Sequence, residues 1–254
     1  MHIDDFIKTM ESLAPAETAM AYDNCGLLIG TEKSEIRRVL VALDCTLAAV
    51  DEAIEKDCDI VLTHHPLLFK AVNRILPDSP DTAAVYKLIR SGIGLFAAHT
   101  NLDAAEGGVN TVLCTLLGIK NASAVPPENI MRVGELDGML PIDDFSQLVC
   151  KRLGASVLVS GPRKPVKRIA VVGGSGGGEY RSAYEYGADC LVTGECKHSD
   201  AIAASSLGIS IIVAGHYETE NPVLVPLIEY LRKNTTGVEY FFSEKNLPVF
   251  RHIR

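Results

Sequence analysis

The chain has 254 residues, of which 47% are hydrophobic and 22% are charged, and its formal net charge at pH 7 is −8. This length allows two modest domains or one large α/β domain with an ordinary apolar core. The negative charge argues against a general nucleic-acid binder. No apolar run reaches transmembrane length and no signal peptide begins at Met1, so we expect a cytoplasmic protein without membrane contact.

The seven cysteines are odd in number and widely spaced, and no two form a Cys-x-x-Cys pair. This pattern favours reduced thiols over a disulfide framework or a zinc knuckle. Cys25 and Cys196 lie in glycine-containing turns, so they are the two thiols for which we consider a functional role.

The first half of the chain alternates apolar strand-like runs with helical spacings. The predicted elements are a helix over 3–13, strands over 27–29 and 38–43, a helix from Thr46 to about Glu55, a strand over 60–63, a helix over 79–91 capped by Ser79, a strand over 93–98, and a helix from Gly107 and Gly108 to Leu117. This order is typical of a mainly parallel sheet.

The second half begins with a different composition. Residues 120–165 are rich in proline and weakly periodic apart from a helix within 143–153, so we interpret them as a connecting segment with some structure of its own. A second series follows, with strands over 168–172, 190–193 and 209–214 and a helix over 179–187. The basic cluster at 162–168 is interpreted as a solvated linker, and an anion- or nucleic-acid-binding patch is the alternative.

A glycine-rich run, residues 173–178, follows the 168–172 strand. It is not a dinucleotide-binding fingerprint, because Glu179 takes the place of the last glycine, and no Lys-Ser or Lys-Thr follows as in a Walker loop. We interpret it as a tight turn from strand to helix. The alternative is a nest of backbone N–H groups that binds an anion.

These patterns predict an α/β fold of two similar domains with mainly parallel sheets. The first domain is predicted over residues 1–125, with or without the C-terminal segment 221–254. The second is predicted over residues 126–220 and takes in the proline-rich connection, 120–165. Apolar strands end in ionisable residues in both halves, which favours an internal structural duplication.

Two histidines, His64 and His65, directly follow the predicted 60–63 strand. Neighbouring side chains of an extended chain point to opposite faces, so this pair can serve two metal ions, or one metal ion and one substrate group. A simple exposed turn is the alternative. Ligands collect beyond the carboxyl ends of parallel strands, where we also expect Asp44, His99 and Asp103.

Imidazole and carboxylate groups without thiolates suit zinc, iron, manganese or nickel. One tetrahedral zinc ion needs three or four protein ligands, so the larger set of strand-end groups fits two divalent metal ions better. Such a pair can activate water and polarise a substrate oxygen. His216 and Glu220 belong to this set, because a helix that begins at Gly215 directs residues four apart to the same side.

Five motifs occur in a fixed order: Asp23-Asn24-x-Gly26-Leu27, Thr63-His64-His65-Pro66, His99-Thr100-x-Leu102-Asp103, Gly173-Gly174-Ser175-Gly176 and Gly215-His216-x3-Glu220. As a set they resemble the Nif-three-like family, whose bacterial members are called type 2 homologues of GTP cyclohydrolase I. The resemblance covers nearly the whole chain. Tyr22 stands where many family members have Trp, and Glu195 stands where Asp is expected.

The resemblance implies two α/β domains with a dinuclear metal site in the cleft between them, and a toroidal homohexamer. The implied metal ligands are His64, His65, Asp103, His216 and Glu220. The function that we expect is metal-dependent hydrolysis of a nucleotide or related heterocycle, as in a GTP cyclohydrolase, with His99 and His198 as candidate proton-transfer groups. The alternatives are a metal-stabilised scaffold linked to transcription and a metallochaperone.

Overall fold

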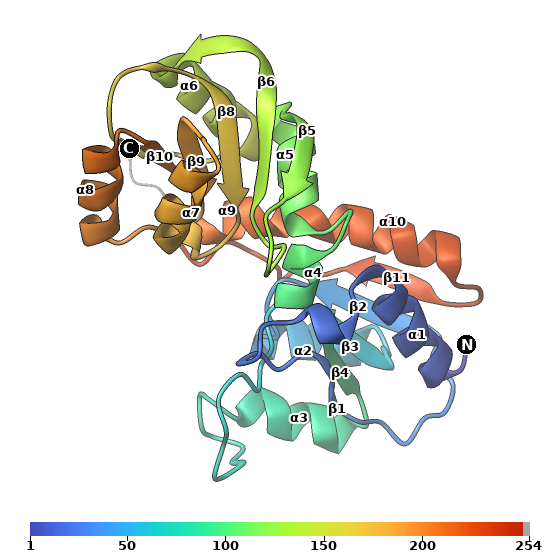
Figure 1. Ribbon diagram of the computed structural model, residues 1–254. Coiled ribbons are helices and arrows are strands. Elements are labelled where there is room, and N and C mark those ends of the chain that lie inside the picture. The colour runs from blue at the N-terminus through green and yellow to red at the C-terminus, as the bar shows by residue number, and fades with distance from the viewer. Residues whose placement is uncertain (251–254) are drawn as a thin grey trace. The chain divides into compact units, whose positions relative to one another are not determined.

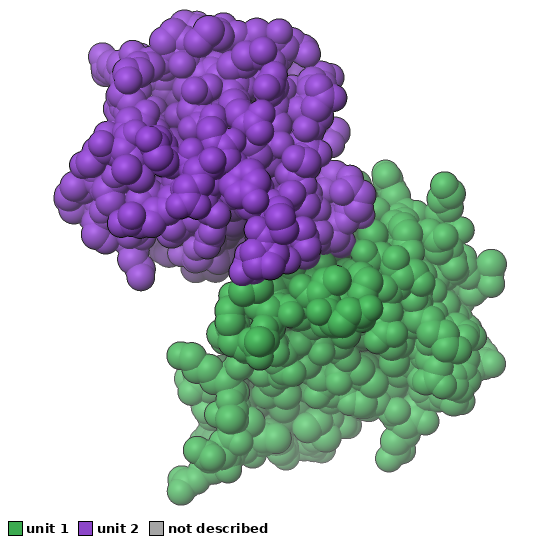
Figure 2. Space-filling view, in the orientation of Figure 1, with its two compact units in different colours: residues 1–102, 224–247 green, residues 103–223, 248–254 purple. Residues whose placement is uncertain are grey.

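The computed structural model describes residues 1–250, and the chain separates into two compact units (Figure 1, Figure 2). Unit 1 consists of Met1–Leu102 and Leu224–Leu247, and unit 2 consists of Asp103–Val223 with residues 248–250. Each unit is built on one β-sheet, which confirms the predicted α/β fold class. Within residues 1–250, no helix combines the length and apolar character needed to cross a membrane.

Unit 1 has a five-stranded sheet in the order β1-β4-β3-β2-β11. Its strands are β1 (Gly26–Ile29), β2 (Arg38–Ala42), β3 (Ile60–Thr63), β4 (Gly94–Ala97) and β11 (Glu239–Phe242), and its helices are α1 (Ile3–Leu13), α2 (Leu47–Glu55), α3 (Ala83–Ser91) and α10 (Leu224–Asn234), with α4 (Thr100–Ala104) at the boundary with unit 2. β1 is antiparallel to β4, and the other neighbours are parallel.

Helices cover both faces of the sheet in unit 1. Leu40, Val61 and Leu95 lie side by side on one face and pack against α2 and α3. On the other face, the ring of Phe96 meets that of Phe6 from α1 edge to face, with centroids 5.7 Å apart. Strands that are covered on both faces read as continuous apolar runs, which explains why β2 and β3 were predicted correctly.

Unit 2 has a six-stranded sheet in the order β5-β6-β8-β9-β10-β7. Its strands are β5 (Lys120–Ala124), β6 (Arg132–Pro141), β7 (Leu158–Ser160), β8 (Pro165–Val172), β9 (Cys190–Thr193) and β10 (Ser210–Val213), and its helices are α5 (Val109–Leu117), α6 (Ile142–Leu153), α7 (Tyr180–Glu185), α8 (His198–Leu207) and α9 (His216–Glu220). β8, β9 and β10 are parallel, and the outer strands join them in antiparallel fashion.

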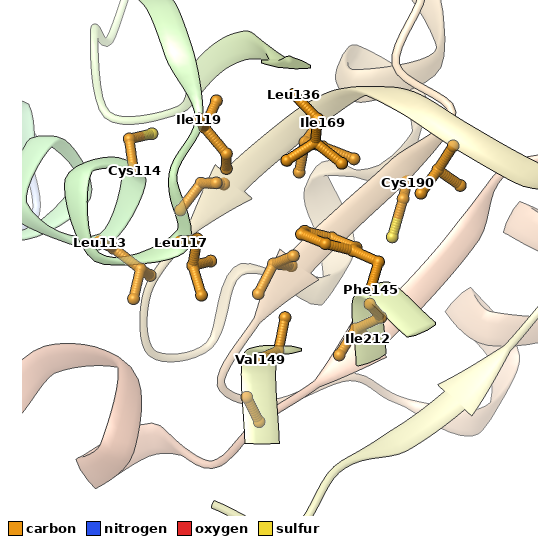
Figure 3. Close-up of a cluster of buried hydrophobic side chains, with 14 of the residues drawn as sticks. Leu113, Cys114, Leu117, Ile119, Leu136, Phe145, Val149, Ile169, Cys190 and Ile212 are labelled. Atoms are coloured by element: carbon orange, nitrogen blue, oxygen red, sulfur yellow. The ribbon is translucent and has the colours of Figure 1, made fainter. Parts of the chain in front are cut away.

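The sheet of unit 2 also has a core on each face. Figure 3 shows one of them, where Phe145 of α6 and Leu113 of α5 pack against Ile169 of β8. Ala170 of the same strand points the other way and packs against α7, with Tyr180 in the same cluster. The strict alternation along β8 therefore separates two apolar clusters.

Residues 120–165 are more ordered than the predicted connecting segment. They supply β5, β6, α6 and β7, so they are an integral part of the unit 2 sheet. The side chains of β5 and β7 are almost all exposed, and this is why their sequences lack an apolar signal. In the basic cluster, Lys167 and Arg168 lie on β8 and pair with Glu135 of β6 at 3.2 and 3.4 Å.

The start of one predicted helix was wrong. α3 begins at Ala83 with Thr82 as its N-cap, whereas the sequence predicted a cap at Ser79. The carbonyl of Ser79 accepts from the N–H groups of Thr82 and Ala83, which closes a turn before the helix. The hydroxyl of Thr82 bonds to the backbone of Leu76, so it is occupied outside the helix.

Candidate metal centre

Three histidines of unit 1 gather where β3 and β4 end. His64 and His65 directly follow β3, and His99 lies two residues beyond β4. The two strands are parallel neighbours, so their carboxyl ends meet at the same edge. One ring nitrogen from each histidine lies within 4.8 Å of the others, and the ring centroids are 5.0 to 5.6 Å apart.

Hydrogen bonds orient the two histidines after β3. The Nδ1 atom of His64 lies 2.8 Å from the carbonyl oxygen of Ala98, and Nδ1 of His65 lies 2.8 Å from Oδ1 of Asp44. Carbonyl and carboxylate oxygens only accept, so we assign the hydrogen to Nδ1 and the lone pair to Nε2 in both rings. This arrangement is typical of metal-binding histidines, whose second nitrogen donates to a carboxylate or backbone carbonyl.

His99 has the same arrangement with a buried carboxylate. Its Nδ1 donates to Oδ1 of Asp23 at 2.9 Å, and the side chain of Asp23 is 0% exposed. Burial raises the pKa of Asp23, but hydrogen bonds from His99, Thr100 and Cys25 outweigh it and hold the pKa well below its ordinary value. Asp23 is therefore a carboxylate that orients His99, rather than only a turn residue.

The thiol of Cys25 is part of this network. It donates to Oδ2 of Asp23 at 3.1 Å, and burial together with that bond raises the pKa of the thiol to about 12. A thiol with such a pKa is protonated at neutral pH, and the thiolate is the reactive form. Cys25 therefore acts as a hydrogen-bond donor. None of the seven cysteines forms a disulfide in the structure, in line with the predicted reduced thiols.

Unit 2 carries a second cluster on α9, which begins at His216 directly after Gly215, as the sequence predicted. His216 and Glu220 are one turn apart, with Nε2 of His216 3.0 Å from Oε2 of Glu220. The other ring nitrogen, Nδ1, lies 3.0 Å from Oε1 of Glu195. A neutral imidazole donates one hydrogen, so two carboxylates at one ring call for a further positive charge, either a ring proton or a metal ion.

Glu195 is held as a carboxylate in the loop after β9. The hydroxyl of Ser175 donates to its Oε2 atom at 2.7 Å. That bond, opposed by burial and helped by the bond from His216, lowers the pKa of Glu195. Glu195 therefore orients His216 as Asp44 orients His65, and this role is available to Glu as well as to the expected Asp.

Two acidic side chains of unit 2 lie close together. One carboxylate oxygen of Asp103, on α4, lies within 4.8 Å of one from Glu220, which is only 4% exposed. Two carboxylates at this distance repel, and a bound cation relieves the repulsion. Asn110 holds this region, because its Nδ2 donates to the carbonyl of Asp103 and its Oδ1 accepts from the N–H of Gly173.

The glycine-rich run forms a tight turn with a short 3-10 helix, Gly176–Glu179, as predicted. Gly174 has a φ of +59°, and a Cβ there would lie 2.0 Å from Oε1 of Glu220. A Cβ on Gly177 would lie 2.6 Å from Cα of Cys196. The run therefore allows a carboxylate and a backbone segment to approach closely, and the nearby negative charge disfavours the alternative of an anion nest.

The sequence did not predict the roles of two side chains that support the candidate ligands, Asp23 and Asn110. Asp23 was interpreted as part of a turn, and no role was given to Asn110. The Asp-Asn pair before Gly26 was the one available signal for Asp23. His198 is exposed at the first residue of α8 and lies outside both clusters.

Comparisons with known proteins match nearly the whole chain to one family. The model of the Duf34/NIF3 (NGG1p interacting factor 3) family matches residues 1–248. A Clostridium acetobutylicum protein is 32% identical over 268 residues, covering 99% of this chain and 98% of its own, and a Clostridium perfringens protein is 33% identical over 262 residues, covering 100% of both. Each is named GTP cyclohydrolase 1 type 2 homolog.

Solved structures give the same result. A Staphylococcus aureus hypothetical protein has a TM-score of 0.90 and 31% identity, with 100% of this chain and 99% of that chain covered. Reduced HcgD from Methanocaldococcus jannaschii has a TM-score of 0.84 and 27% identity, with 96% and 98% covered. Because the family model and relatives above 30% identity span nearly its whole length, the chain belongs to the Duf34/NIF3 family.

Proposed function

We propose that the chain binds two divalent metal ions and hydrolyses a nucleotide or related heterocycle with them. The proposed ligands are His64, His65, Asp103, His216 and Glu220. The observation that carries the proposal is the orientation of the histidines, since Nδ1 of His64, His65 and His216 each faces an oxygen of the same unit, as in histidines that bind a metal through Nε2. The donor set suits zinc, iron, manganese or nickel.

Two bound divalent ions would supply activation of water and polarisation of a substrate oxygen. The chain's own residues have separate tasks. Asp44 and Glu195 keep His65 and His216 in the ligating orientation. We assign proton transfer to Nε2 of His99, because Asp23 holds Nδ1 and stabilises the ring when it is protonated. His198 is the second candidate for proton transfer.

The names of the relatives, GTP cyclohydrolase 1 type 2 homolog, support a nucleotide substrate. The proposal also includes a cytoplasmic location and a toroidal homohexamer, of which the homohexamer follows from the sequence resemblance. Light scattering tests the assembly, and a species of about the chain mass of 27.3 kDa would contradict it.

The metal is tested by elemental analysis of the wild type, His64→Ala, Glu220→Ala and the exposed control His2→Ala. We expect two ions per chain in the wild type and the control, and fewer in the other two variants. A wild-type content near one ion per chain, or full retention in both ligand variants, would contradict the proposal. Hydrolysis of nucleotides is then followed with the metal that the analysis identifies.

A further inference from the structure

We propose that Tyr22 and Phe69 form an aromatic platform in unit 1 that binds the planar base of a nucleotide beside the histidine cluster. This inference rests on the proposed function, and it identifies the part of the substrate that unit 1 recognises. It is carried by a long ordered loop, by the geometry of three rings, and by the exposed lysine that follows one of them in the chain.

The loop between β3 and α3, residues 64–82, contains no helix or strand. Loops of more than about 15 residues without secondary structure are uncommon in compact domains, and those that occur are usually functional. This loop is tied down at two points. Nδ2 of Asn24 donates to the carbonyl of Leu68 at 2.7 Å, and the hydroxyl of Thr82 bonds to the backbone of Leu76. Phe69 therefore has a defined position next to one anchor.

The rings of Tyr22, Phe69 and His99 form a continuous row. The centroids of Tyr22 and Phe69 are 6.4 Å apart with an interplanar angle of 83°, and those of Phe69 and His99 are 6.0 Å apart at 90°. Tyr22 is 65% exposed and Phe69 is 44% exposed. Two large aromatic side chains that leave this much surface in water beside a polar cluster indicate a ligand site.

A nucleotide base fits this row better than a purely apolar ligand. Exposed aromatic rings bind bases by stacking on their flat faces, and such stacking tolerates different bases. Lys70 directly follows Phe69 in the chain and is exposed, whereas the acidic residues of the loop, Asp78 and Asp81, come near its end. A cation next to an exposed aromatic residue in the chain suits a ligand with a planar base and a phosphate group.

The platform also places the bound ring next to a reactive group. The ring of Phe69 meets the ring of His99 in a T-shaped contact, and the proposed function assigns proton transfer to His99. A base stacked on Phe69 would therefore lie beside that imidazole. Val72, Ile75 and Leu76 are exposed farther along the loop, so contact between copies of the chain is the competing use of this surface.

The experiment measures binding of GMP, AMP and ribose 5-phosphate to the metal-loaded protein by calorimetry. Ribose 5-phosphate has the sugar and phosphate without the base. In Phe69→Leu and Tyr22→Leu we expect GMP and AMP to bind about tenfold more weakly, while ribose 5-phosphate is unaffected. Phe69→Tyr should restore binding, because it restores the ring. Tyr184→Leu, which removes a half-exposed ring from α7, is the control and should bind as the wild type does.

Equal affinity of GMP for the wild type and Phe69→Leu would overturn the platform, as would GMP that binds no more tightly than ribose 5-phosphate or not at all. Variants that break up the assembly and keep GMP affinity would assign the loop to contacts between copies. Metal content is measured on the same samples, since none of these side chains is a proposed ligand. Full metal content with unchanged GMP affinity would therefore overturn the platform alone, whereas a metal-free wild type would overturn the proposed function.

Discussion

The two units share a strand-helix-strand frame, β2-α2-β3 in unit 1 and β8-α7-β9 in unit 2, which can be compared residue by residue. In unit 1, β2 and β3 pair in parallel from Val39 with Ile60 to Ala42 with Thr63. In unit 2, β8 and β9 pair in parallel from Ile169 with Cys190 to Val172 with Thr193. Residues 38–63 therefore correspond to residues 168–193, which supports the structural duplication predicted from the sequence.

A carboxylate fastens the start of this frame in both units. Oδ2 of Asp59 accepts from the N–H groups of residues 37 and 38, at 2.7 and 3.1 Å. Oδ2 of Asp189 accepts from the N–H groups of residues 167 and 168, both at 2.8 Å. The carbonyl of each aspartate in turn accepts from the strand that follows, at Gly94 in unit 1 and Ser210 in unit 2.

The units differ where the strands end. Extending the correspondence places Gly194 of unit 2 opposite His64 of unit 1, and Glu195 opposite His65. A Cβ on Gly194 would lie 2.7 Å from the carbonyl oxygen of Gly174 and 2.8 Å from Cα of His216. Unit 2 thus brings α9 against this strand end, where unit 1 has an imidazole. The frame sets the positions, and the loops after the strands determine which chemistry occupies them.

The largest effect should come from adding a side chain at that close approach. Gly194→Ala places a methyl group against backbone atoms, so we expect a loss of about 3 kcal/mol in the free energy of unfolding. Gly178→Ala is the matched control, because no atom lies within 4 Å of a Cβ there. Thermal unfolding measures both. A melting temperature of Gly194→Ala equal to that of the control would show that α9 can move away freely.

The orienting carboxylates allow the two units to be compared by their effect on metal affinity. Asp44→Asn in unit 1 and Glu195→Gln in unit 2 each weaken the hold on one histidine ring, so we expect metal affinity to fall by about 10- to 100-fold. Competition with a coloured chelator measures the affinity. Glu135→Gln, which alters a surface ion pair on β6, is the control. Unchanged affinity in both orienting variants would remove the proposed task of these carboxylates.

The smallest effect concerns the two fastening aspartates. Burial raises the pKa of Asp59, but bonds from Lys33 and from the N–H groups of residues 37 and 38 outweigh it and lower the pKa. We expect Asp59→Asn to cost about 1.5 kcal/mol at pH 7, a typical value for a hydrogen bond to a charged group. In both variants the amide oxygen can still accept from the two backbone groups, but Asp189→Asn should cost less, because Asp189 has no counterpart of the lysine bond among the described residues.

The pH dependence of Asp59→Asn follows from the lowered pKa. The unfolded-state pKa of aspartate is about 3.9, so the stabilisation is fully present above that pH and is lost as the pH falls through the lower folded-state pKa. The difference in melting temperature between wild type and variant should therefore be constant from pH 7 to pH 5 and shrink below pH 4. A difference that persists unchanged in strong acid would contradict this account.

Local patterns were enough to predict most elements of the frame. The helix over 3–13 and the strands over 60–63 and 190–193 have their predicted limits. Thr46 caps α2 as predicted, with its hydroxyl 3.1 Å from the N–H of Ala49. These elements were predictable because continuous apolar runs and capping residues act over a few neighbouring positions. β5 and β7 were not, because exposed edge strands carry little apolar alternation.

The sequence by itself determined the kinds of groups that stand at the strand ends, since histidines and acids follow apolar runs in both halves. The tertiary structure alone decided which oxygen orients which ring. Asp23 and His99 are separated by 76 positions, yet their side chains are 2.9 Å apart. No local pattern contains such a pair, because it forms only when the sheet brings the turn before β1 beside the end of β4.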